Sequence, residues 1–212
     1  MADRKILTTP RGVAKFCHLV KPSTKFDPEG VYTASLLLEG QEAADLIEII
    51  DQAIEDNLTE IRKDHKYAKA KKIKENDPPY KDDTDKEGNE TGKTLFNFKQ
   101  KATATAKDGS KLTFRPVLYD SRGNVIHPKD VGFGSTVRIA FELIPYHTPS
   151  TGAGVQLRMR GVQILELSSG ELTAEALGFD IEEDGYVGTD ETVEEIFDDT
   201  DTAEGAAEGA DF

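Results

Sequence analysis

Hydrophobic and polar residues alternate with a period of two over much of the chain, which is the pattern of β-strands that bury one face. Residues 94–106 show it most clearly. One predicted face there consists of Phe96, Phe98, Gln100 and Ala102, and the other of Asn97, Lys99, Lys101 and Thr103. The same pattern recurs at 12–20, 30–38, 111–119, 136–146 and 155–167. These segments predict about six strands joined by short turns.

One long stretch departs from this alternation. Between residue 41 and about residue 74, apolar residues recur at the spacing of one helix face, which predicts a single amphipathic helix. Its final turns, 63–74, are mostly basic and lose the apolar stripe, so we expect them to project or fray. Asn76-Asp-Pro-Pro-Tyr80 ends the predicted helix, and residues 81–93 are interpreted as a charged, mobile loop.

The C-terminal residues differ in composition from the rest of the chain. Residues 180–212 contain 14 Asp and Glu and no Lys or Arg, so the net charge of −14 lies entirely there. Such a segment repels itself and has too little apolar surface to fold, which predicts a disordered acidic tail. We therefore expect a folded domain at 1–179, with a helical and loop insertion at about 41–93, followed by the tail.

The composition also excludes several classes of protein. Hydrophobic residues make up 37% of the 212 residues, and no apolar run approaches the ~20 residues of a membrane span. The N-terminus has no apolar segment of the kind found in secretory signals. Cys17 is the only cysteine, which excludes an internal disulfide framework. We expect a soluble intracellular protein.

No pattern of catalytic or metal-binding residues is evident. The four histidines are widely spaced, and no glycine-rich loop has the strand-to-helix context that holds a phosphate. Asp83 begins a sequence similar to a calcium loop, but Thr94 stands where such a loop has its bidentate Glu. The sequence therefore predicts no metal, no cofactor and no enzymatic activity.

Basic and aromatic residues lie on the predicted polar faces of the strands. The basic residues are Lys99, Lys101, Arg115, Arg138, Arg158 and Arg160, and the aromatic residues are Phe114, Tyr119 and Tyr146. A sheet face of this kind can bind single-stranded nucleic acid, because cations follow the phosphates while bases stack on aromatic rings. The alternative is an ordinary polar outer face of an antiparallel sheet.

The predicted elements fit a mainly β protein with an OB-fold, a small and partly open Greek-key barrel. We expect a five- to six-stranded antiparallel barrel with one long helix inserted, followed by the disordered acidic tail. The helix follows the second predicted strand, whereas in the usual OB-fold it follows the third.

Several short motifs occur in an order that resembles one protein family. They are Phe96-Asn-Phe-Lys99, Val117-Leu-Tyr-Asp-Ser-Arg-Gly123, Gly132-Phe-Gly-Ser-Thr-Val-Arg138, Leu143-Ile-Pro-Tyr146, Gly152-Ala-Gly154, Val162-Gln-Ile-Leu-Glu-Leu167 and the terminal Asp211-Phe212. In this order they resemble the replicative single-stranded DNA-binding protein of short-tailed bacteriophages. The resemblance implies an OB-fold that binds DNA through Lys99 and Tyr146. That family has aromatic residues where this chain has Lys101 and Thr148, so Tyr80 or Phe114 would be replacements.

Residues and resemblance together predict a sequence-nonspecific single-stranded DNA-binding protein that coats and protects DNA in phage replication, recombination and repair. The acidic tail would compete for the DNA groove, with Phe212 as an apolar anchor next to Asp211. The resemblance implies that the tail recruits the phage DNA polymerase and helicase-primase, in the cytoplasm of the infected bacterial host. It also permits a homodimer or cooperative assembly on DNA.

A rival hypothesis is an acidic protein-interaction or DNA-mimic factor without DNA binding of its own. The tail supports it, but the strand segments 1–38 and 93–160 have a combined net charge of +10, which a mimic does not need. The sequence leaves open which aromatic residues stack on bases, whether duplex DNA or RNA also binds, and what the basic run 63–74 does.

Overall fold

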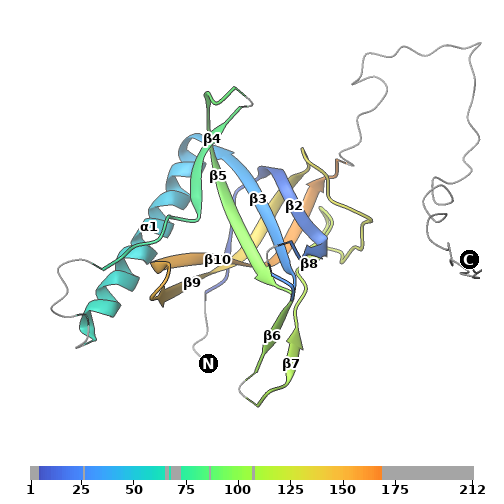
Figure 1. Cartoon of the computed structure of the whole chain (residues 1–212). Helices are drawn as coiled ribbons and strands as arrows, with labels where there is room; N and C mark the ends of the chain where they lie inside the picture. Colours follow the sequence, from blue (N-terminus) through green and yellow to red (C-terminus); the bar gives the residue numbers. More distant parts are fainter. Residues whose placement is uncertain are drawn as a thin grey trace, which may run out of the picture. The chain divides into compact units, whose positions relative to one another are not determined.

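The computed structural model describes residues 5–168, apart from 26, 65–66, 68–72, 86 and 107, and these residues belong to one unit of the chain. The period-two segments form strands, as predicted. The strands are β1 (Leu7–Thr8), β2 (Gly12–Ser23), β3 (Val31–Glu39), β4 (Tyr80–Thr84), β5 (Glu90–Lys101), β6 (Thr103–Thr105), β7 (Lys111–Thr113), β8 (Val117–Tyr119), β9 (Thr136–Thr148) and β10 (Gly152–Glu166). Helix α1 (Gly40–Lys63) lies between β3 and β4 in the chain (Figure 1).

Five long strands close into a barrel. Within the described residues the order β9-β2-β3-β5-β10 is hydrogen-bonded from strand to strand, and pairing of β9 with β10 completes the ring. A closed five-stranded Greek-key barrel with one helix is an OB-fold, so the predicted fold class is confirmed. Two pairings differ from the expected antiparallel arrangement, because β10 runs parallel to both β5 and β8.

The barrel core consists of side chains that alternation turns inward. Phe96, Phe98 and Phe141 are almost fully buried, together with Leu36 and Leu157 from neighbouring strands. Each such side chain contributes about 1.5–3 kcal/mol by leaving water. Because inward residues alternate with outward ones, the same strands present polar side chains on the outside of the barrel.

Helix α1 packs on the barrel with one face. Ala43, Leu46 and Ile50 of the predicted apolar stripe are buried, and α1 contacts β3, β9 and β10. Asn57 joins the helix to the sheet, because its Nδ2 donates to the carbonyl oxygens of Tyr146 and Gly154 at 3.0 Å each. The ends of β9 and β10 are therefore held in place by the helix.

Three predicted boundaries need correction. Helix α1 ends at Lys63, where the apolar stripe ends, instead of continuing to about residue 74; residues 65–66 and 68–72 lie outside the described residues. The predicted loop 81–93 is largely β4 and the start of β5. The predicted strand 111–119 is two short strands, β7 and β8, separated by 114–116.

The sequence of β4 is acidic and therefore typical of a loop, although the segment is a strand. Asp82 is exposed, but Asp83 is buried, where it accepts hydrogen bonds from the Lys15 ammonium and the Thr91 hydroxyl. A buried carboxylate is tolerated when it is paired and hydrogen-bonded, and sequence alone does not reveal such partners.

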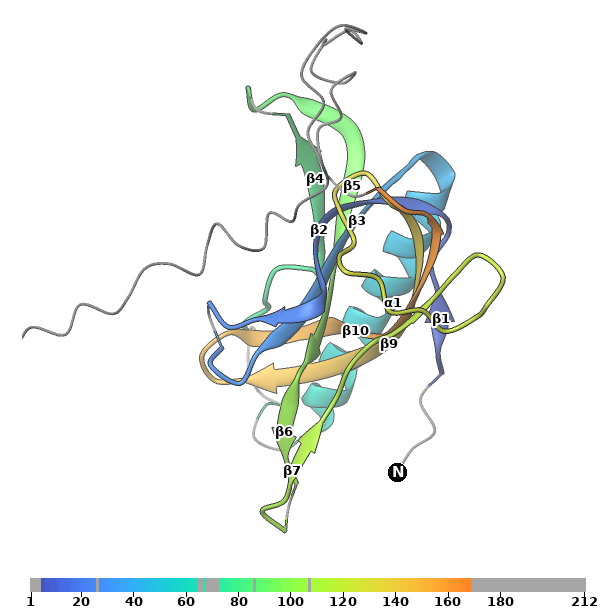
Figure 2. The same ribbon diagram turned by 90° about the vertical axis from the view of Figure 1, so that its right-hand side faces the viewer.

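Two pairs of strands extend from the barrel in opposite directions. Figures 1 and 2 show β4 with the start of β5 at one end and β6 with β7 at the other. Within the part of the chain that the structure describes, no helix has the length and apolar character needed to cross a membrane. The predicted domain boundary near residue 179 and the tail at 180–212 lie outside the described residues.

Candidate nucleic-acid interface

The outward side chains of five neighbouring strands form two rows across the barrel. Register pairs place His18 beside Thr33, Thr33 beside Lys99, Lys99 beside Arg158 and Arg158 beside Glu142; we call this the charged row. Phe16 lies beside Ser35, Ser35 beside Asn97, and Gln156 lies one residue before the Leu157–Phe98 pair; we call this the amide row. The charged row runs from β2 to β9 and the amide row from β2 to β10, both perpendicular to the strands.

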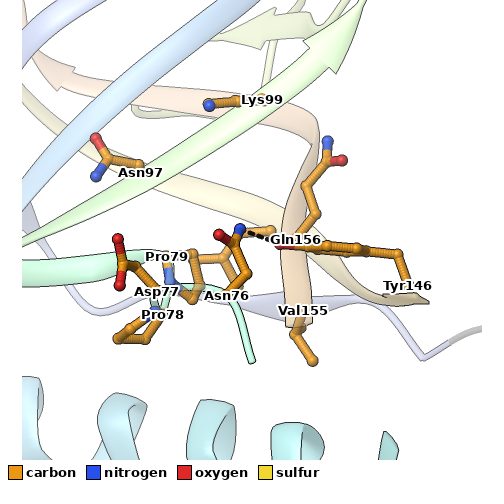
Figure 3. A pocket seen from close by; sticks show the side chains of 10 residues that line it. Asn76, Asp77, Pro78, Pro79, Asn97, Lys99, Tyr146, Val155 and Gln156 are labelled. Carbon is orange, nitrogen blue, oxygen red and sulfur yellow. Dashed lines mark hydrogen bonds between the residues drawn. The ribbon is translucent and has the colours of Figure 1, made fainter. Parts of the chain in front are cut away.

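The surface under these rows is hollowed. A cavity of about 450 Å³ is lined by Asn76, Asp77, Pro78, Pro79, Asn97, Lys99, Tyr146, Val155, Gln156 and Leu157 (Figure 3). A second cavity of about 330 Å³ is lined by Ser23, Asp27, Val31, Thr33, Ser35, Asn97, Phe98 and Lys99. Because Asn97 and Lys99 line both, the two cavities adjoin each other across β5, and we call them together the groove.

The first cavity lies where β5 and β10 separate. The two strands pair where Phe98 and Lys99 of β5 meet Leu157 and Arg158 of β10. Beside the cavity, each strand instead forms backbone hydrogen bonds with the segment 73–79. Ala153 of β10 donates to Lys74 O and accepts from Asn76 N, both at 2.8 Å. Asn97 N of β5 donates to Pro79 O at 2.8 Å. The segment 73–79 is thus a wedge between the two strands and forms one wall of the groove.

Tyr146 is held at the edge of the groove by two contacts. Its Oη accepts a hydrogen bond from Asn76 Nδ2 at 2.6 Å, drawn as a dashed line in Figure 3. The ring also passes close to Gly154, where a Cβ atom would lie 2.6 Å from Oη and 2.8 Å from Cζ. Any side chain at position 154 would displace the ring, so glycine there allows the tyrosine to lie against β10.

The cations in and beside the charged row differ in their partners. Lys99 is exposed and forms no ion pair with any residue that the structure describes. Arg158 instead donates from Nε to Glu142 Oε2 at 3.0 Å, and Arg160 Nε lies 3.5 Å from Glu142 Oε1. Glu142 is only 6% exposed, so its charge is held by the two guanidinium groups. Lys101 has a weaker partner, Asp27, at 3.5 Å.

The family model of the bacteriophage T7 single-stranded DNA-binding protein matches residues 11–167, which is well over half of the chain. The chain belongs to this family. The single-stranded DNA-binding protein of Escherichia phage T7 is 27% identical over 207 residues, covering 87% of this chain and 85% of the relative. Predicted membership is therefore confirmed.

Solved structures of two phage single-stranded DNA-binding proteins agree with the fold. The crystal structure of gp2.5, a single-stranded DNA-binding protein encoded by bacteriophage T7, matches with a TM-score of 0.67 and 25% identity, covering 88% of this chain and 100% of that chain. The single-stranded DNA-binding protein of bacteriophage Enc34, solved in complex with single-stranded DNA, matches with a TM-score of 0.54 and 17% identity, covering 77% and 88%.

The structure brings some of the predicted site residues together and separates others. Lys99 and Tyr146 line the same cavity, and Lys101, Arg158 and Arg160 lie on the same outer surface of β5 and β10. Arg138 and Tyr119 line a different cavity of about 240 Å³, next to Gly161 and Gln163.

Two further predicted residues, Phe114 and Arg115, follow β7 and line none of the three cavities. The tail residues Asp211 and Phe212 lie outside the described residues. The roles of all these residues in DNA binding stay predictions.

Sequence reasoning misses several residues that shape the groove. Asn97 and Gln156 alternate with core residues in the same way as Lys99 and Arg158, but a search for cations and aromatic rings does not select them. The segment 76–79 reads in the sequence only as a helix stop, although its two prolines and the bond from Asn97 make it a wall. The sequence signal that could have identified Asn97 and Gln156 is an amide side chain at an outward strand position, two residues from a cation.

Proposed function

We propose that the barrel binds single-stranded DNA without sequence preference, and that the protein coats and protects DNA in phage replication, recombination and repair. The observation that supports this most directly is the groove. In one of its cavities lie Lys99, which is unpaired among the described residues, and the fixed ring of Tyr146, in a chain that belongs to the T7 family. The proposal contains no catalytic step and needs no cofactor.

The geometry suggests how the groove holds a strand. Lys99 neutralises a phosphate, and bases stack on Tyr146 at roughly 1–3 kcal/mol each, whatever the base. Asn97 and Gln156 line the same cavity and offer donors and acceptors to sugars, bases or phosphates. Because both main interactions are indifferent to base identity, binding is nonspecific.

We further propose that the acidic tail regulates this groove. The 14 carboxylates of residues 180–212 are attracted to the same cations as DNA, so the tail competes until DNA displaces it. A flexible segment of this length spans about 30 Å on average. In this proposal the released tail, ending in Asp211 and Phe212, recruits the phage DNA polymerase and helicase-primase in the host cytoplasm, and the protein assembles cooperatively or as a homodimer on DNA.

The test is salt-dependent binding of a fluorescent oligo(dT) to the full-length protein and to a variant ending at residue 179. We expect both to bind, with tighter binding and a steeper salt dependence for the truncated chain. Equal or weaker binding after truncation contradicts tail competition. No binding by either chain contradicts the DNA proposal and favours the rival function, an acidic protein-interaction factor.

A further inference from the structure

We infer that Phe16, on β2 beside the groove, is a second base-stacking side chain in addition to Tyr146. The inference rests on the proposed function, since it names a further contact to the same single-stranded DNA. Phe16 is 63% exposed, which is high for a phenylalanine in the middle of a β-strand.

A β-bulge turns this ring outward. Ala14 pairs with Leu36 and both are buried, so regular alternation would point Phe16 into the core as well. The register shifts between Ala14 and Phe16, and Phe16 consequently pairs with the outward Ser35. Cys17 then faces the core in its place, next to buried Ala34.

Bulges that redirect one side chain are typical of functional positions. Here the bulge has a cost, since it exposes to water an aromatic side chain whose burial would contribute about 1.5–3 kcal/mol. The core position that the bulge vacates is filled by the smaller Cys17. A ligand that covers the ring would offset this cost.

The surroundings of Phe16 indicate a base as that ligand. Its neighbour Ser35 donates from Oγ to Asn97 Oδ1 at 2.9 Å, and both residues line the groove. The ring is therefore the end of the amide row, beside polar side chains that line the groove. Lys15 Nζ lies 6.0 Å from the ring centroid, although its charge is already paired with the buried carboxylate of Asp83.

The spacing suits a strand of several nucleotides. Three steps between neighbouring strands separate β2 from β10, which is about 14 Å along the sheet. A single-stranded DNA that crosses β2, β3, β5 and β10 would stack at both ends, on Phe16 and on Tyr146, with Lys99 between them. Phe16 would also supply an aromatic platform that the sequence lacks at Lys101 and Thr148.

The chain contains no tryptophan, so Phe16→Trp introduces a single indole at the proposed contact, whose emission is distinct from that of the six tyrosines. We expect saturating oligo(dT) to quench its emission, while binding itself is followed independently by anisotropy of a labelled oligonucleotide. Ile49→Trp, on the exposed side of α1, is the matched control and should not be quenched. If anisotropy shows binding by Phe16→Trp while the emission of its indole stays unchanged, the inference is overturned and the proposed function stands.

Truncation of the ring gives a second, independent readout. Phe16→Ala should weaken oligo(dT) binding about five- to tenfold, because one stacking contact is lost, and the slope of log affinity against log salt should not change. Unchanged affinity would contradict the inference. If neither the wild-type chain nor the variants bind any single-stranded DNA, the proposed function fails, and this inference fails with it.

Discussion

Lys99 and Arg158 are direct neighbours on the outer face of β5 and β10, yet their electrostatic situations differ. Lys99 is exposed and unpaired among the described residues, whereas Arg158 shares the buried carboxylate of Glu142 with Arg160. A phosphate that approaches Lys99 meets a full positive charge. A phosphate that approaches Arg158 meets a charge already partly neutralised by Glu142.

The difference separates two roles that sequence patterns treat as one. A cation without a partner gains most from a phosphate, since it gives up only water and counterions. A guanidinium that is paired with a buried carboxylate already stabilises the fold. Removing it would leave the buried carboxylate of Glu142 with one partner fewer. We therefore expect Lys99 to dominate DNA affinity, and the two arginines to contribute to both stability and binding.

Charge reversal at Lys99 is expected to have the largest effect. Lys99→Glu should weaken oligo(dT) binding at least tenfold at low salt and reduce the magnitude of the salt slope by about one or more, because a phosphate contact is replaced by repulsion. Lys111→Glu, on exposed β7 away from the groove, changes the net charge equally and serves as the control. Similar losses for both variants would show that overall charge, not the groove, governs binding.

Removing the carboxylate should move affinity in the opposite direction. Glu142→Gln frees two guanidinium groups next to Lys99, so we expect oligo(dT) affinity to rise about two- to fivefold with a steeper salt dependence. The folded state should lose about 1–2 kcal/mol, since the charge-assisted bonds from Arg158 and Arg160 weaken. Titration with labelled oligo(dT) measures the change in affinity, and urea unfolding measures the change in stability. A fall in affinity without unfolding would mean that Glu142 holds the arginines in their binding orientation.

The barrel itself was predictable because its signal is local. Alternation in each strand decides which residues enter the core, and 94–106 showed this without any knowledge of its neighbours. The roles of the cations were not predictable, because Glu142 and Arg158 are 16 residues apart and meet only through the register of β9 with β10. Likewise, alternation places Phe16 inside, and only the bulge reverses it.

Lys15 is a third kind of cation, which is paired and lines neither cavity of the groove. Lys15 donates to the buried Asp83, and this hydrogen bond, helped by the Thr91 hydroxyl at 3.0 Å, holds the pKa of Asp83 below its usual range. Because the pKa is lower in the folded state, the pair stabilises the fold at pH values above the unfolded value of about 4. That stabilisation is lost as the pH falls through the depressed pKa.

The smallest effect is therefore expected from Asp83→Asn, and it should depend on pH. At pH 7 its melting temperature should lie a few degrees below that of the wild type, and the difference should shrink towards zero as the pH falls below about 4. Asp82→Asn, at the exposed neighbouring position, should show no such convergence. Because Asp83 lines neither cavity of the groove, oligo(dT) affinity should change far less than in Lys99→Glu. A pH-independent difference in melting temperature would mean that Asp83 acts through packing and not through its charge, and the pair with Lys15 would then differ in kind from that of Glu142.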